Sequence, residues 1–305
     1  MHLLFAIFLF VFGSAVGSFL GAMIWRLHDF RETFSAKSRK MWRGFWGFRN
    51  EFSRKFLRSH PGKNQRALPE KYRHSYCETC GHELSVLDLI PILSFAKNRG
   101  KCAYCGEKIG ISALLIELVG GFVFAFSFLF WPQDFTKNDP LIFANFAVWL
   151  VICALFVALF FYDARWKELP NVFVAPLIFF AILLAGMHFA VNPQPEFFAN
   201  FALALVPVFG VYLLLFLVSA GKWIGFGDVK FGIAVALILP DIRLAVSVLV
   251  FANFAGTLLV LPGLLTKKLS RNTQIPFGPF LIAATFFIFI FSAQLIDFMN
   301  TILLI

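Results

Sequence analysis

Two aspartates lie beside long apolar stretches of this sequence, where ionisable side chains are unusual and are often functional. Asp228 ends the motif Gly225-Phe226-Gly227-Asp228, and Asp163 follows an apolar run that ends at Tyr162. Ionisable groups at a membrane boundary are costly to desolvate. Two carboxylates brought together there could share one proton and activate a water molecule, which is the chemistry of aspartic proteases. The alternative for each residue is an ordinary charge that flanks a helix, because structural charges occupy such places too.

The residues around Asp228 indicate how its carboxylate would be held. Gly225 and Gly227 permit a sharp backbone turn and a close approach by other groups, and Lys230 follows two residues after Asp228. A third acid, Glu117, is alone in an apolar run, so we expect it to face the interior of a helix bundle. There it serves either the structure or the amine of a substrate, and both alternatives stay open.

The composition places these residues in a polytopic membrane protein. Of 305 residues, 59% are hydrophobic and only 14% are charged, which is more apolar surface than a soluble globule could bury. We predict an all-α protein with about eight transmembrane helices and a small cytoplasmic four-cysteine domain of the zinc type. The predicted spans are Leu3–Ile24, Ile111–Trp131, Leu141–Tyr162, Val172–Val191, Asn200–Ala220, Phe231–Leu239, Leu244–Leu265 and Phe280–Ile305. The sixth is too short to cross alone, so it extends back through the glycine motif or belongs to a tilted, broken helix.

Basic residues alternate between the loops that join these spans. The first, third, fifth and seventh loops hold 25 of the 27 Lys and Arg residues, 18 of them between Arg26 and Gly110, and the other loops hold two. The positive-inside rule puts the basic loops in the cytoplasm and both termini outside. Asp163 and Asp228 then lie on the cytoplasmic side. A net charge of +10 would suggest nucleic acid in a soluble protein, but here the charge follows the loops, so we expect the lipid bilayer and no nucleic acid as a partner.

Four cysteines form two C-x-x-C pairs, Cys77 with Cys80 and Cys102 with Cys105, with 21 residues between the pairs. This spacing is typical of a zinc ribbon or knuckle, in which four thiolates surround one metal ion. A reducing cytoplasm disfavours structural disulfides, and a redox pair is the main alternative. The fifth cysteine, Cys153, lies in an apolar run and is interpreted as a small buried hydrophobe.

The predicted domains are a first helix, 1–25, a cytoplasmic basic and four-cysteine domain, 26–110, and a transmembrane domain, 111–305. Within the second, the stretch Arg31–Arg73 interleaves aromatic residues with Lys and Arg. It is either a helix that lies along an anionic membrane surface or a poorly ordered cytoplasmic insertion.

Taken in order, these motifs resemble the type IV prepilin leader peptidase and N-methyltransferase family over nearly the whole chain. G-x-G-D alone is shared with presenilin-like proteases, whereas the ordered set is specific. Two stretches depart from the family pattern, the Arg31–Arg73 segment and the residues that follow Asp163. The resemblance rests on Gly13 to Leu20, Ile24-Trp25-Arg26-Leu27, the paired cysteines with Ile90 to Ser94 and Arg99 to Cys102, Leu115 to Leu118, Asp163 with Leu169-Pro170-Asn171, Gly225 to Lys230, and Ile275 to Phe280.

The resemblance implies a bifunctional enzyme of the bacterial inner membrane with an aspartic peptidase in residues 111–305. Asp163 and Asp228 would be its catalytic pair, supported by Gly225, Gly227, Lys230 and Glu117. The four paired cysteines would bind one structural zinc ion. The substrates would be type IV prepilins or pseudopilins, cut on the cytoplasmic side after a glycine and then methylated on the new N-terminal amine with S-adenosylmethionine.

Two other functions remain as alternatives on the sequence alone. Another G-x-G-D intramembrane protease would share the aspartates but would leave the cysteine domain unexplained. A transporter coupled to ions or protons would use membrane carboxylates in a different way. The sequence shows no Gly-rich nucleotide fold, so it does not locate the S-adenosylmethionine site.

Overall fold

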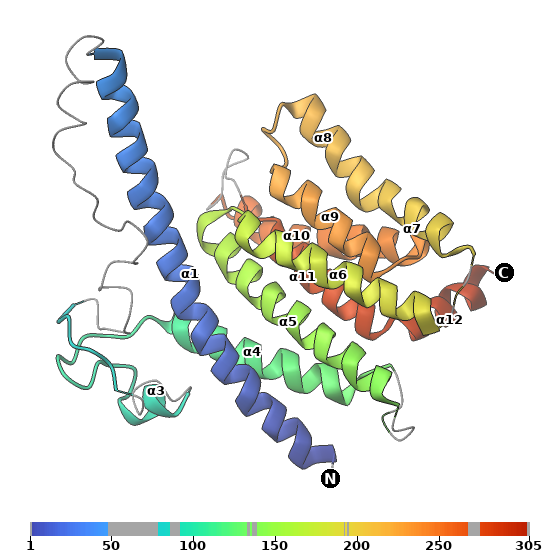
Figure 1. The fold of residues 1–305 in the computed structure, drawn as a ribbon, viewed down its shortest axis with the longest axis horizontal. Coiled ribbons are helices and arrows are strands. Elements are labelled where there is room, and N and C mark those ends of the chain that lie inside the picture. The colour runs from blue at the N-terminus through green and yellow to red at the C-terminus, as the bar shows by residue number, and fades with distance from the viewer. Residues whose placement is uncertain are drawn as a thin grey trace, which may run out of the picture. The chain divides into compact units, whose positions relative to one another are not determined.

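The computed structural model describes residues 2–47, 79–85, 92–132, 135, 139–191, 193, 195–267 and 275–303 of the chain. Within these ranges the chain is helical, and the β-bridge between Lys101 and Lys108 is isolated. The chain divides into two compact units, one made of Met1–Gly17 and Leu118–Ile305 and the other of Ser18–Glu117. Figure 1 labels the elements.

The helices of the described residues agree with the predicted all-α class. In chain order they are α1 (His2–Gly47), α3 (Leu93–Lys97), α4 (Ile111–Leu129), α5 (Pro140–Trp166), α6 (Asn171–Val191), α7 (Phe197–Leu205), a π-helical turn (Val206–Gly210), α8 (Val211–Ser219), α9 (Phe226–Ile238), α10 (Ile242–Leu265), α11 (Gly278–Ile290) and α12 (Ser292–Leu303).

Helix α1 continues far beyond the predicted span Leu3–Ile24 and ends at Gly47. No proline lies in this stretch, and no glycine lies between Gly21 and Gly44, so nothing in the sequence stops the helix at the membrane boundary. The beginning of the segment Arg31–Arg73 is therefore helical. Its remainder, residues 48–73, lies outside the described residues.

Six helical stretches of the described residues are long and apolar enough to cross a membrane, and the count rises to seven if the pair α11–α12 is one span. The six are the first part of α1, α4, α5, α6, α10 and the continuous stretch Phe197–Ser219, which comprises α7, the π-helical turn and α8. The predicted number of eight is not reached, for two reasons. Helix α9 has 13 residues, which extend for roughly 20 Å, less than the hydrocarbon core of about 30 Å. Helices α11 and α12 meet at a bend of 80°. Helix α9 does extend back through the glycine motif, which was one of the two expectations for the short sixth span.

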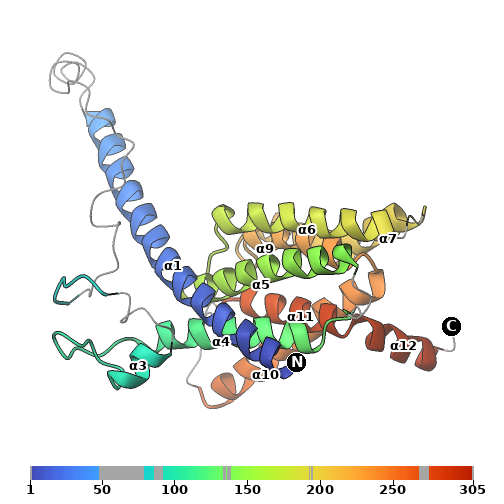
Figure 2. The ribbon, with the colours of Figure 1, turned by 60° about the horizontal axis from the view of Figure 1, so that its bottom comes forward.

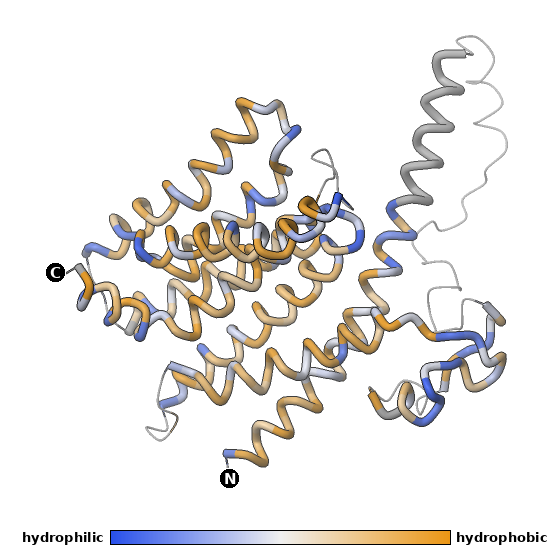
Figure 3. The backbone as a smooth tube through the Cα atoms, turned by 180° about the vertical axis from the view of Figure 1, so that it is seen from behind, coloured by the Kyte–Doolittle hydropathy of each residue, from blue (hydrophilic) through white to orange (hydrophobic). Residues whose placement is uncertain are grey.

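Within the unit that contains residues 118–305, α6 packs against both α5 and α9, and α11 packs against both α10 and α5. Figures 1 and 2 show these helices running side by side. Figure 3 shows that they are mostly apolar along their lengths, with hydrophilic residues near their ends. Polar chemistry is therefore concentrated where helices begin and end.

Close helix contact also explains the small residues of the first predicted span. A Cβ atom on Gly13 would lie 2.5 Å from the Gly120 carbonyl oxygen, and one on Gly121 would lie 2.5 Å from Ser14 Oγ. Helices α1 and α4 therefore approach each other through glycine and serine, as small residues allow in membranes. Part of the Gly13 to Leu20 motif is thus a packing motif.

The core between α4, α5 and α11 is aromatic and lies away from the aspartates. Trp149 is fully buried, stacks on Phe289 with ring centroids 3.8 Å apart and donates a hydrogen bond from Nε1 to Ser127 Oγ over 3.0 Å. Cys153 is also fully buried, and its Sγ lies 3.6 Å from Ser127 Oγ. The interpretation of Cys153 as a buried core residue is confirmed.

Candidate active site

Asp163 lies in the last turn of α5. The helix ends there because Lys167 adopts a left-handed conformation with a φ of 58°, and its backbone N–H donates to the Asp163 carbonyl over 2.8 Å. The following Leu169-Pro170 cannot continue the helix, and α6 begins at Asn171. The Asp163 side chain is only 5% exposed, so its carboxylate is held inside the protein near the end of a helix.

Asp228 lies in the first turn of α9, after Gly225 as the N-cap residue in extended conformation. A carboxylate at this position is stabilised by the positive end of the helix dipole. Gly227, the residue before Asp228, packs on Leu169, and Leu169 packs on Gly278, which lies beside the Asp163 carboxylate. The structure therefore brings together the two aspartates that the sequence singled out, 65 residues apart.

Leu169 fills the space between the ends of these helices. A Cβ atom on Gly227 would lie 2.8 Å from the Leu169 Cβ, and one on Gly278 would lie 3.3 Å from the Leu169 Cδ2. Gly227 is therefore required for close approach. The expected sharp turn lies before the glycine motif. The positive φ values of this region are those of Ala220 and Gly221, where α8 ends, and Gly225 itself is extended.

Gly278 is a site residue that the sequence around the two aspartates does not reveal. It is the first residue of α11, and a Cβ atom there would lie 2.6 Å from Asp163 Oδ2. The same oxygen is buried and has no hydrogen-bond partner among the described residues. Gly278 does belong to the motif Ile275 to Phe280, which contributes to the family resemblance, but nothing in the sequence places this motif beside Asp163.

Lys230 joins α9 to the beginning of α6. Its Nζ donates a hydrogen bond to Asn171 Oδ1 and lies 4.8 Å from the centroid of the Phe226 ring. This bond ties the turn that carries Asp228 to the segment that follows Asp163. Lys230 thus positions the two segments relative to each other.

A cleft of about 290 Å³ opens between α10 and the segment that leads into α11. Asn253 and Thr257 contribute polar atoms to its wall, and Phe277 is part of its lining. Phe277 directly precedes Gly278, so this part of the cleft's lining is one residue from the glycine beside the Asp163 carboxylate. Tyr212 packs on the same Phe277, with ring centroids 5.9 Å apart.

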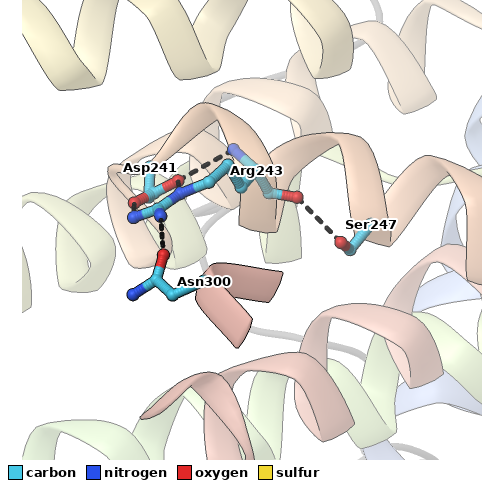
Figure 4. A network of polar contacts seen from close by, with 4 residues as sticks. All are labelled: Asp241, Arg243, Ser247 and Asn300. Carbon is cyan, nitrogen blue, oxygen red and sulfur yellow. Dashed lines mark hydrogen bonds and ion pairs between the residues drawn. The ribbon is translucent and has the colours of Figure 1, made fainter. Parts of the chain in front are cut away.

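Asp241, another acid near the spans, lies at the opposite end of α9 from Asp228 and has a structural environment (Figure 4). It caps α10 by accepting from the Arg243 N–H over 2.8 Å, and Arg243 also donates to Asn300 of α12 over 2.8 Å. Burial alone would raise the pKa of Asp241, but the hydrogen bonds and positive charge of Arg243 outweigh it and hold that pKa below its usual value.

Comparison with known proteins assigns the family. A model of the bacterial peptidase A24 N-terminal domain matches residues 11–131, and a model of the type IV leader peptidase family matches residues 149–261, which include both aspartates. A prepilin leader peptidase/N-methyltransferase of Burkholderia pseudomallei is 30% identical over 229 residues, 71% of this chain and 68% of that protein. The chain belongs to the prepilin leader peptidase/N-methyltransferase family.

Other relatives carry the same name. The protein of Dichelobacter nodosus is 28% identical over 226 residues, 72% of each chain. That of Pseudomonas aeruginosa is 26% identical over 272 residues, 89% of this chain and 85% of the relative. No solved structure matches the chain.

The cysteine domain of this prepilin leader peptidase family member lies in the region matched by the N-terminal model. The Sγ atoms of Cys80, Cys102 and Cys105 all lie within 4.8 Å of one another, whereas Cys77 lies outside the described residues. The backbone turns tightly around Cys102, whose N–H donates to the Glu107 carbonyl over 2.7 Å and whose carbonyl accepts from Gly106 over 2.9 Å. A tetrahedron with Zn–S bonds of about 2.3 Å has S–S edges of about 3.8 Å, which lies within this limit.

Glu117 belongs to the same unit as the cysteines. Its Oε2 accepts a hydrogen bond from the backbone N–H of Ile92 over 2.8 Å. Ile92 has a φ of 61°, which is unusual for a β-branched residue. The carboxylate of Glu117 thus holds a strained turn just before α3, which is a structural role within its own unit.

Proposed function

We propose that this protein cleaves the leader peptide of type IV prepilins or pseudopilins and N-methylates the new N-terminus. Membership of the family supports both activities. The observation that supports the peptidase is the placement of Asp163 and Asp228 at one end of the bundle, where Leu169 contacts both Gly227 and Gly278, and Asp163 Oδ2 is buried there without a hydrogen-bond partner among the described residues. An unpaired buried acceptor is what a site that binds a water or a substrate leaves open.

The two carboxylates would act as a unit that holds one proton. The ionised carboxylate accepts a proton from water as the water oxygen bonds to the scissile carbonyl carbon. The protonated carboxylate donates a hydrogen bond to the carbonyl oxygen. When the C–N bond breaks, the leaving amine takes up a proton from the pair, which returns to its starting state.

The site would open on the cytoplasmic side of the inner membrane, with both termini outside, an arrangement in which the short helix α9 and the bent pair α11–α12 each take the chain across the membrane. This placement is supported by the contacts of Gly278 with Asp163 and Leu169 and of Gly227 with Leu169, which bring the third, fifth and seventh loops to one end of the bundle. We propose that residues 111–305 form the peptidase and that residues 26–110 form a cytoplasmic domain. The substrate's apolar helix would stay in the bilayer while its leader junction enters from the cytoplasm.

Two further groups belong to this proposal. Cys80, Cys102 and Cys105, with Cys77, would hold one zinc ion that stabilises the cytoplasmic domain. S-adenosylmethionine would supply the methyl group, and no residue is assigned to its binding.

The test is cleavage of a purified prepilin by Asp163→Asn and Asp228→Asn variants in detergent micelles. Both substitutions keep the side-chain shape and remove the proton chemistry, so each is expected to abolish cleavage. Methylation of a pilin that is already cleaved should survive both, because we place the two reactions at separate sites. Asp241→Asn is the matched control and should cleave normally. Normal cleavage by either active-site variant, or ion flux that depends on these aspartates without cleavage, would refute the peptidase assignment.

A further inference from the structure

Four buried side-chain polar atoms have no hydrogen-bond partner among the described residues: Trp131 Nε1, Asn145 Oδ1, Asp163 Oδ2 and the Tyr212 hydroxyl. A buried polar group without a partner costs about 1–3 kcal/mol, so each one calls for an explanation. Two of the four lie around the aspartate pair. One of them, Asp163 Oδ2, is an acceptor, and the other, the hydroxyl of Tyr212, can donate.

Tyr212 is only 3% exposed and belongs to the apolar run of α8. Helix α8 packs against α9, the helix that carries Asp228. The Tyr212 ring meets the ring of Phe277 edge to face at an angle of 86°, and Phe277 precedes the glycine that contacts Asp163. Tyr212 thus belongs to a helix that packs on the helix of Asp228, and its ring packs against the segment that leads to Asp163.

The backbone just before Tyr212 directs this side chain. Val206–Gly210 form a π-helical turn, which adds a residue to the turn and rotates the helix that follows; such turns are frequent at functional sites. Gly232 of α9 packs directly on this turn, since a Cβ atom there would overlap the Val208 carbonyl. Helix α9, which carries Asp228, and the helix that carries Tyr212 are therefore fixed against each other.

We propose that the Tyr212 hydroxyl donates a hydrogen bond to the scissile carbonyl oxygen as water adds to the carbonyl carbon. This inference rests on the proposed peptidase function. During the addition the carbonyl π bond breaks, negative charge grows on its oxygen, and a fixed donor at that oxygen stabilises the transition state more than the ground state. The tyrosine keeps its proton throughout, so the proton balance of the aspartate pair is unchanged. The missing partner of the hydroxyl in the free protein is then the substrate.

The experiment is a comparison of Tyr212→Phe with the unmodified protein. Phenylalanine keeps the contact with Phe277 and removes only the hydroxyl. We expect kcat for prepilin cleavage to fall by about 10²–10³-fold, as for the loss of one oxyanion donor, with little change in KM. The thermal midpoint should stay the same or rise, because an unsatisfied buried group is removed, and methylation of pre-cleaved pilin should be unchanged.

Trp131→Phe is the control, because it removes another unpartnered buried donor at the far end of the bundle and should leave kcat unchanged. An unchanged kcat in folded Tyr212→Phe would overturn the proposal. So would a parallel loss of cleavage, methylation and thermal stability, which indicates a structural role. Failure of the peptidase assignment is recognised separately, because the Asp163→Asn and Asp228→Asn variants would then still cleave.

Discussion

Gly278→Ala should disable the peptidase by moving a single carboxylate. Gly278 does not have a positive φ, so alanine meets no backbone obstacle and the effect comes from space alone. The added Cβ would lie 2.6 Å from Asp163 Oδ2 and 3.1 Å from its Cγ, where ordinary contacts begin at 3.4 Å. The carboxylate must therefore shift by about 1 Å, and a displacement of that size in a catalytic group costs about 10²-fold in rate.

The assay is the steady-state rate of leader removal from purified prepilin, followed by mass, together with the thermal midpoint in the same detergent. Overpacking should also lower the free energy of unfolding by about 1–3 kcal/mol. Gly186→Ala in α6 is the matched control, because a Cβ atom there would meet nothing within 4 Å, and it should cleave at the unmodified rate. A Gly278→Ala protein that cleaves at the unmodified rate would show that the Asp163 carboxylate does not need its observed position.

Three further outcomes are expected. Cys102→Ser should lose the zinc found by metal analysis, about one ion per chain for a single tetrahedral site, while Cys153→Ser keeps it; zinc retained by the first variant would contradict the site. Lys230→Met removes the bond between α9 and α6 and should lower kcat with the thermal midpoint falling by only a few degrees, about 1 kcal/mol for one hydrogen bond; unchanged cleavage would argue against a positioning role. Asp241→Ala should lower the free energy of unfolding by about 1 kcal/mol, because a helix cap is lost. Arg243 holds the pKa of Asp241 below its usual value, so the ionised carboxylate stabilises the fold fully at pH 7 and the effect of the substitution should shrink below about pH 4. An equal effect at pH 3 would contradict the assignment.

Local sequence determined a large part of this protein. The membrane class follows from composition, because 59% hydrophobic residues cannot be buried in a soluble domain of this size. The helical spans follow from run length, since five of the six long runs are one α-helix or the beginning of one, and the sixth, Phe197–Ser219, is helical throughout with a π-helical turn in its middle. The spacing of the two C-x-x-C pairs predicted the clustering of Cys80 with Cys102 and Cys105; turn geometry within a pair is local, whereas the approach of Cys80 to the second pair is set by the fold between the pairs. The alternation of basic loops predicted that the loops after Asp163 and before Asp228 lie on the same side of the membrane. In the structure these two loops are in contact, through Leu169 and Gly227.

Only the tertiary structure decided which residues surround the aspartates. Gly278 faces Asp163 from a helix more than a hundred residues away, and Leu169 separates the helix ends because of how α5, α6 and α9 are rotated. A π-helical turn aims Tyr212 inward, and no hydrophobic pattern encodes such a turn in a run that is apolar all round. The length of the apolar run Phe280–Ile305 also did not predict the bend of 80° between α11 and α12. Apolar spans look alike from every face, so the rotation of each helix is set by packing against its neighbours rather than by its own sequence.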